Sequence, residues 1–436
     1  MQLTRQQLYY AALSGLLLTG AFPKFGAGWL AWFAMVPLLA SIRNQTPRDT
    51  FRLGLLTGLV HYLTLLYWLA GTMNTYGGMS WFLSIPILFL FSFYLALYIA
   101  LFSVTVGRLI RNPGQCLWLL PVVWVAVEYL RAKLFTGFPW ALLGHSQYEA
   151  LQIIQISDIF GVYGVSGLVA LANGCLLLAW LHLAGEDWHG RDIARRHVVG
   201  ACLCFSLVMA TVLVYGIRQM GVLDRKPAQT ESARIAVIQG NIRQSDKWDP
   251  AFRVATVQKY IDLSRAAKLK AADLIVWPET ATPFYFLQEK PFTGIIQQVI
   301  RSRDAHFLIG SPSFQETDGE TVYYNSAYLM NPDGQSAGKY SKAHLVPFGE
   351  YVPYGKWLPF VGKIVEAVGD FSPGKEGETL EWDGHRLGIQ ICYEMVFPKL
   401  SRKMVENQAN LLINITNDAW YGRSSAPFQR FSMTVF

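Results

Sequence analysis

The sequence predicts two parts of different fold class: a polytopic bundle of membrane-spanning α-helices over residues 1–220, then a layered α/β domain of sandwich type over residues 221–436. Asp, Glu, Lys and Arg number 19 in residues 1–217 and 48 in residues 218–436. The charged fraction therefore rises from about 9% to about 22%. In addition, long uncharged apolar windows give way, from about Ala233, to short β-rich runs that alternate with helical patterns.

The first part contains the windows expected of membrane helices. A hydrocarbon core about 30 Å thick requires about 20 apolar residues in helical form, and most of the windows reach or approach that length. We therefore predict about seven spans. A cleavable signal peptide is a poor interpretation of the first window, because Arg5 alone precedes it and no small-residue cleavage site follows. The windows without Asp, Glu, Lys or Arg are residues 6–23, 25–42, 53–70, 81–106, 117–127, 161–183 and 198–217.

The orientation follows from the basic residues in the short loops, because cytoplasmic loops carry the excess of Lys and Arg. A cytoplasmic N-terminus assigns nine basic residues to the inside and three to the outside, which favours that orientation. An odd number of spans then places the second part outside, in the bacterial periplasm. The inside set is Arg5, Arg43, Arg48, Arg52, Arg108, Arg111, Arg191, Arg195 and Arg196, and the outside set is Lys24, Arg131 and Lys133.

The second part reads as an ordered series of strands and helices. We expect helices over 249–267, 293–302 and 397–407, and hairpins joined by Asn331-Pro-Asp-Gly and Asp383-Gly384. Such a series predicts a layered α/β sandwich. The expected strands are 234–239, 274–277, 306–310, 321–330, 337–340, 380–382, 386–391 and 411–415.

Three of these strand ends carry residues that suit nucleophilic catalysis. Glu279 follows the strand at 274–277, Lys342 follows 337–340, and Cys392 follows 386–391. A thiol near a cation or a helix N-terminus gains acidity, a carboxylate can accept its proton, and a lysine can stabilise an oxyanion. Each residue alone also fits a plain role: a buried inert thiol, a solvated lysine and a surface carboxylate.

Four local motifs in fixed order favour the catalytic interpretation. With them, the chain resembles the nitrilase, or carbon-nitrogen hydrolase, superfamily, whose catalytic set is Glu, Lys and Cys in that order. The polytopic first part makes it similar to the membrane branch of that superfamily, the apolipoprotein N-acyltransferases. The motifs are Val276-Trp-Pro-Glu-Thr280, Tyr340-Ser-Lys-Ala-His-Leu-Val-Pro-Phe-Gly-Glu-Tyr-Val-Pro353, Ile389-Gln-Ile-Cys-Tyr-Glu394 and Ile415-Thr-Asn-Asp-Ala-Trp-Tyr-Gly422; residues 133–146 and 239–248 extend the likeness.

The resemblance implies a nitrilase-like α-β-β-α sandwich and a role for each matching residue. Glu279 would be the general base, Lys342 the transition-state stabiliser, Cys392 the nucleophile and Glu350 the carboxylate that orients the lysine. The resemblance implies neither a cofactor nor a metal, and no His-Glu-x-x-His pair is present. The substrate-binding positions that it suggests are Trp248, Tyr393, Glu394, Phe138 and Trp140.

The reaction that the resemblance implies is acyl transfer in the bacterial inner membrane. The acyl chain of a phospholipid, in this family usually phosphatidylethanolamine, would pass through a Cys392 thioester to the N-terminal amine of a diacylglyceryl-cysteine apolipoprotein. A membrane-tethered amidase or nitrilase remains an alternative, because the same residues hydrolyse carbon-nitrogen bonds. A transporter or receptor is disfavoured, since Glu128 and Asp158 lie only at span edges. Nucleic-acid binding is also disfavoured despite the net charge of +7, because the basic residues are scattered among acids.

Two further expectations concern the end of the chain. Residues 356–368 are apolar and aromatic between Lys356 and Lys363, which predicts an interfacial arm or a segment of the domain core. The family that the chain resembles continues through further strands to a last membrane helix, whereas this sequence stops at Phe436. We therefore expect either a fragment or a shortened, inactive relative.

Overall fold

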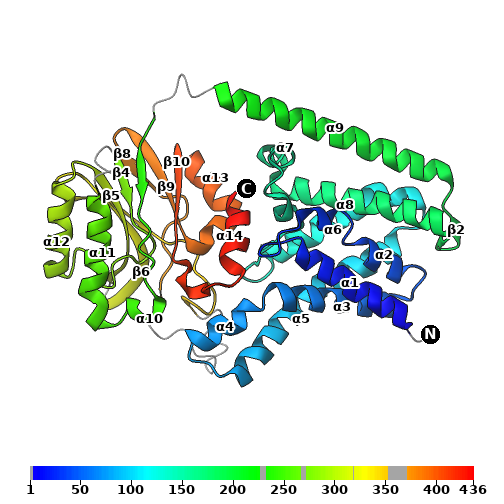
Figure 1. Ribbon diagram of the computed structural model, residues 1–436, viewed down its shortest axis with the longest axis horizontal. Helices are drawn as coiled ribbons and strands as arrows, with labels where there is room; N and C mark the ends of the chain where they lie inside the picture. The colour runs from blue at the N-terminus through cyan, green and yellow to red at the C-terminus, as the bar shows by residue number, and fades with distance from the viewer. Residues whose placement is uncertain (1–2, 226–231, 267–271, 318, 352–370) are drawn as a thin grey trace. The chain divides into compact units, whose positions relative to one another are not determined.

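The computed structural model describes residues 3–225, 232–266, 272–317, 319–351 and 371–436. The chain forms two compact units, and their elements are drawn in Figure 1. Unit 1 comprises residues 1–71, 80–230 and 423–436, and unit 2 comprises residues 72–79 and 231–422. The chain therefore does not divide once near residue 220, as the sequence suggested, because one short segment from each part belongs to the other unit.

Unit 1 is helical. Its longest helices carry the apolar windows of the sequence, and a two-stranded antiparallel pair joins α8 to α9. The elements are α1 (Arg5–Gly20), α2 (Val36–Ile42), α3 (Pro47–Leu65), α4 (Trp68–Thr75, whose end belongs to unit 2), α5 (Trp81–Leu109), α6 (Cys116–Lys133), α7 (Leu151–Ile154), α8 (Ser157–Ala184), β1 (Asp187–Trp188), β2 (Arg191–Asp192), α9 (Arg195–Arg225) and α14 (Ala426–Thr434).

Fewer helices than predicted are long enough to span a membrane. Among the described residues, α5, residues 113–133, α8 and α9 qualify by length and composition, and α3 with α4 forms a pair bent by 48° that raises the number from four to at most five. The windows at 6–23 and 25–42 form the 16-residue α1 and the short helices between residues 28 and 42. The expectation of about seven spans thus exceeds what the described helices support by this measure.

Small residues allow the helices of unit 1 to pack closely. Gly54 and Gly58 lie one turn apart on α3, and a Cβ at Gly58 would lie 2.6 Å from the Cα of Ala96 on α5. This close approach is the packing that Gly-x-x-x-Gly spacing permits between membrane helices. The buried Asn173 on α8 donates to Ala31 O at 2.9 Å and accepts from Met35 N at 2.8 Å. A polar side chain thereby fixes α8 to the segment before α2.

Unit 2 contains two β-sheets. The five-stranded sheet has the order β3-β4-β5-β6-β7, parallel from β3 to β5 and antiparallel from β5 to β7. The three-stranded sheet has the order β10-β9-β8, with β10 parallel to β9. The strands are β3 (Ile235–Val237), β4 (Leu274–Val276), β5 (His306–Thr317), β6 (Glu320–Met330), β7 (Ser336–Ser341), β8 (Thr379–Trp382), β9 (His385–Ile391) and β10 (Leu411–Ile415).

The two sheets pack face to face. Their shared core contains Val276 and Leu308 from the larger sheet and Leu387 and Ile389 from the smaller one. Helices α11 (Arg253–Arg265) and α12 (Lys290–Arg301) pack on the outer face of the larger sheet, and α13 (Pro398–Glu406) packs against β9 (Figure 1). The predicted α-β-β-α sandwich is confirmed, and the strands begin and end within a few residues of their predicted limits, apart from the longer β5.

Candidate active site

The four predicted catalytic residues lie within unit 2, in the segments that follow β4, β7 and β9. Glu279 is 7% exposed, Lys342 1% and Cys392 8%. Parallel and antiparallel pairing brings these strand ends to one edge of the sandwich. Buried ionisable groups need partners, because an isolated charge in an apolar interior is costly. The contacts of each residue therefore define the site.

Both oxygens of the Glu279 carboxylate accept hydrogen bonds. Oε1 accepts from Asn325 Nδ2 at 2.9 Å, and Oε2 accepts from the backbone N of Asn417 at 2.9 Å. Lys342 Nζ lies 3.8 Å from Oε1. Donors on both sides favour the ionised carboxylate and fix its orientation, as a general base requires.

Lys342 and Glu350 form a buried ion pair. Lys342 Nζ lies 3.0 Å from Oε1 and 2.8 Å from Oε2 of Glu350, and Asn325 Nδ2 donates to the same carboxylate at 2.9 Å. Burial alone would lower the pKa of Lys342, but the negative charges of Glu350, Glu279 and Cys392 outweigh it and the pKa is raised. The lysine is thus held as a cation, and Asn325 bridges the two carboxylates.

Cys392 begins a short 3-10 helix directly after β9 and has a φ of 53°. This left-handed conformation is uncommon for a residue with a side chain, and such residues concentrate at functional sites. Asn414 Nδ2 on β10 donates to Cys392 O at 3.2 Å and to Gln390 O at 3.3 Å. The neighbouring strand therefore holds the turn that presents the thiol.

Glu394 joins the turn of Cys392 to the turn of Lys342. Its Oε1 accepts from Tyr340 Oη and from the backbone N of Ala343 and of His344 at 2.8–3.0 Å, and its Oε2 accepts from Ile391 N at 2.7 Å. The residue is fully buried. Burial raises the pKa of Glu394, whereas these donors and Lys342 lower it in part. This geometry supports a positioning role more directly than the contact with substrate that we predicted.

The other predicted substrate-binding residues of unit 2 lie beside this network. Trp248, which is half-buried, ends α10 (Gln244–Lys247). The Tyr393 ring lies 5.1 Å from that of Phe397, edge to face, and 6.1 Å from the ring of His344. Their substrate contacts remain predictions. Residues 356–368, predicted as an interfacial arm or core segment, lie outside the described residues.

Phe138 and Trp140 belong to unit 1. Their rings stack at 6.2 Å, and Trp140 Nε1 donates to Gln429 Oε1 on α14 at 2.9 Å. Trp140 is only 2% exposed. These contacts place both rings in the packing of unit 1, and the proposed lining of a lipid entrance stays a prediction.

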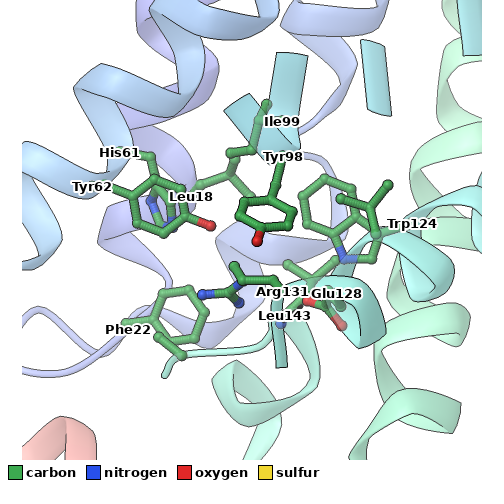
Figure 2. A pocket seen from close by; sticks show the side chains of 12 residues that line it. Leu18, Phe22, His61, Tyr62, Tyr98, Ile99, Trp124, Glu128, Arg131 and Leu143 are labelled. Carbon is green, nitrogen blue, oxygen red and sulfur yellow. Dashed lines mark hydrogen bonds between the residues drawn. The ribbon is translucent and has the colours of Figure 1, made fainter. Parts of the chain in front are cut away.

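Two charged residues of α6 differ from their predicted positions. Arg131, counted above as a loop residue, is 3% exposed, and Glu128, placed above at a span edge, is 4% exposed. Figure 2 shows both beside His61 and Tyr98, around a small cavity of unit 1. Arg131 donates to Trp140 O at 2.9 Å, and Glu128 Oε1 accepts from Leu143 N at 2.6 Å. Both therefore hold the loop after α6, and Arg131 drops out of the count of loop charges.

Sequence reasoning missed three residues around Glu279. Asn325 lies within β6 in a run that carries no motif, and Asn417 belongs to the quoted 415–422 motif without an assigned role. Lys247, which is 3% exposed, donates to Glu279 O at 3.1 Å. It directly precedes Trp248, so its place in the quoted 239–248 segment was the one available signal. Among the described residues, no cluster of three or more His, Cys, Asp or Glu could hold a metal ion.

Known families match both parts of the chain. The family model for the apolipoprotein N-acyltransferase N-terminal domain matches residues 14–175, and the carbon-nitrogen hydrolase model matches residues 234–435. An apolipoprotein N-acyltransferase of Geobacter metallireducens is 45% identical over 434 residues, which cover 99% of this chain and 81% of that protein. Another, from Methylococcus capsulatus, is 34% identical over 97% of this chain and 80% of its own length.

Solved structures of carbon-nitrogen hydrolases match about half of the chain. An amidase from Nesterenkonia sp. is 19% identical, with a TM-score of 0.32, over 47% of this chain and 74% of its own. A carbon-nitrogen hydrolase from Helicobacter pylori is 19% identical, with a TM-score of 0.33, over 46% of this chain and 68% of its own.

Proposed function

Because the chain belongs to the apolipoprotein N-acyltransferase family, we propose that it transfers an acyl chain in two steps through a thioester on Cys392. The donor is a phospholipid, with phosphatidylethanolamine as the expected head group. The acceptor is the N-terminal α-amine of a diacylglyceryl-cysteine lipoprotein. The observation that carries the proposal is the buried arrangement of Glu279, Lys342 and Glu350 beside the strained turn of Cys392.

In the first step, Glu279 accepts the thiol proton and Cys392 Sγ attacks the ester carbonyl carbon of the donor. The carbonyl oxygen becomes an oxyanion, which the Lys342 cation stabilises. When the intermediate collapses, the ester C–O bond breaks and the leaving alkoxide takes the proton from Glu279. The products are a lysophospholipid and the Cys392 thioester.

In the second step, the acceptor amine attacks the thioester carbonyl carbon. It loses a proton to Glu279, the carbon–sulfur bond breaks, and the proton returns to the Cys392 sulfur. An amide forms and the enzyme is regenerated. A group that serves as base and then as acid must be held in place in both steps, which the two donors to Glu279 support.

We further propose that unit 1 anchors the chain in the bacterial inner membrane, with the N-terminus in the cytoplasm and the catalytic unit in the periplasm. The basic residues of the loops support this orientation, and omitting the buried Arg131 leaves nine against two. Both substrates are lipids, so a catalytic unit on a membrane anchor meets them in their own phase. Reporter fusions at residue 190, in the loop before α9, and after residue 436 test it: activity of a periplasmic reporter at residue 190 contradicts the orientation.

The decisive experiment is detection of the acyl-enzyme. The full chain in detergent micelles is incubated with phospholipid, and Cys392 is examined by mass spectrometry for an acyl adduct. Cys392→Ala should abolish the adduct, and Cys202→Ala, at an exposed cysteine of unit 1, serves as the matched control. Release of ammonia from small amides without an adduct would instead establish a hydrolase. An adduct that persists in Cys392→Ala refutes the assignment of the nucleophile.

A further inference from the structure

Unit 2 contains a second buried lysine at the active site. Lys247 Nζ donates to Glu279 O at 3.1 Å and to Thr280 Oγ1 at 2.6 Å, and the side chain is 3% exposed. We propose that Lys247 is a positioning residue for the general base: it fixes the Glu279–Thr280 turn and adds a positive charge that favours the ionised Glu279 carboxylate. This inference rests on the proposed function, because it assigns how the same base is held.

The turn that Lys247 binds is strained. Thr280 has a φ of 44°, which is unfavourable for a β-branched side chain. Strained residues persist only where surrounding contacts hold them. The two hydrogen bonds of Lys247 fall on consecutive residues of this turn. On the other side, Gly310 approaches so closely that a Cβ there would lie 2.2 Å from Pro278 O.

The helix that carries Lys247 reaches Glu279 by a second route. Gln244, at the start of α10, accepts from Asn417 Nδ2 at 2.7 Å, and the backbone N of Asn417 donates to Glu279 Oε2 at 2.9 Å. One short helix thus supports both the backbone and the carboxylate of the base. A packing lysine would need neither contact.

The charge of Lys247 faces the reacting groups. Burial lowers the pKa of Lys247 to about 8, and the negative charges of Glu279 and Cys392 oppose that shift. The two oxygens that it binds are neutral, whereas Lys342 is paired with Glu350. Among these groups, Lys342 is the other cation close to Glu279. The field of Lys247 therefore acts on the base and the nucleophile.

The main test is the pH dependence of acyl-enzyme formation in Lys247→Met, which keeps the length of the side chain and removes its charge. Without the cation the ionised carboxylate is less favourable, so the acidic limb should move up by about one pH unit. The rate at neutral pH should fall about tenfold to a hundredfold. Lys259→Met, at an exposed lysine of α11, is the control and should leave both unchanged.

Two further variants separate charge from packing. Thr280→Val removes one acceptor but keeps the cation, so the rate should fall while the acidic limb stays in place. Lys247→Arg keeps the charge and should restore the limb; it also cannot deprotonate near pH 8, so a fall in the wild-type rate above that pH should disappear. If Lys247→Met does not fold, these two variants still decide the question.

The outcomes distinguish this inference from the proposed function. A wild-type protein without an adduct on Cys392 contradicts the proposed function itself. An adduct that forms in the wild type, with a lower rate but an unmoved acidic limb in Lys247→Met, overturns the charge role of Lys247 and leaves the acyltransferase intact.

Discussion

Both units bury charged side chains, but they satisfy them differently. In unit 2, Lys342 and Glu350 pair with each other, and the Glu279 carboxylate lies next to the same lysine. In unit 1, Glu128 accepts from the backbone of Leu143, and Arg131, one turn further along α6, donates to the backbone oxygen of Trp140. Side-chain charges thus complement one another in the first case and backbone groups of a loop in the second.

The difference indicates what each set of buried charges does. A pair of opposite charges held by side chains creates a fixed field, which can stabilise charge that develops during a reaction. A charge satisfied by backbone groups fixes the course of a loop and contributes little field to a distant centre. Glu394 belongs to unit 2 but follows the second pattern, since it accepts from the backbone of Ala343, His344 and Ile391.

The largest effect should follow removal of the cation from the paired set. Lys342→Met leaves Glu350 and Glu279 buried without their shared positive charge and removes the oxyanion stabiliser. We expect acyl-enzyme formation to fall by about a thousandfold and stability to fall by about 3–5 kcal/mol. Rapid-quench mass spectrometry and thermal unfolding in detergent measure the two effects. A rate within tenfold of the wild type would contradict the catalytic assignment of Lys342.

A smaller effect should follow neutralisation of Glu394. In Glu394→Gln, one oxygen is replaced by an amide that cannot accept from the donors now facing it, so at least one buried donor loses its partner. We expect a loss of about 1–3 kcal/mol in unfolding free energy. The rate should fall with an unchanged pH profile, because the residue positions two turns. A shifted acidic limb would instead assign it a proton-transfer role.

His344 provides a pH test of the same turn. Burial, with the positive charge of Lys342, lowers the pKa of His344 to about 4, against about 6.5 when unfolded. Below pH 6.5 the unfolded chain therefore binds a proton that the folded chain resists, and the stability contribution present at neutral pH is lost progressively down to pH 4. We expect about 2 kcal/mol. His344→Gln should remove this part of the dependence, and an identical profile in both proteins would refute it.

The smallest effect should come from unit 1. Glu128→Gln keeps an oxygen that can accept from Leu143 N, so we expect a change within about 1 kcal/mol. Thermal unfolding in detergent, compared directly with Glu394→Gln, measures it. Equal losses in the two variants would show that the charge itself, and not the backbone acceptor, holds the loop after α6.

The sequence predicted the sandwich almost element by element, because strand and turn signals such as Asp383-Gly384 act locally. It also located Glu279, Lys342 and Cys392 through their motifs. It did not reveal Asn325 or Lys247, since nothing in their neighbourhoods indicates that distant segments bring them to Glu279. Membrane helices were less predictable: hydropathy detects apolar length, but the 48° bend between α3 and α4 and the shortness of α1 depend on packing.

The exchange of short segments between the units has a consequence for how the chain can be divided. A cut near residue 230 would leave residues 72–79 on the first fragment, although Tyr76 of that segment donates to Ala419 O and packs on Trp420 of unit 2. It would leave α14 on the second fragment, although Gln429 accepts from Trp68 and Trp140 of unit 1. The two fragments would therefore behave as a split protein, each completing the other's fold, and neither corresponds to a domain that can be excised at one point.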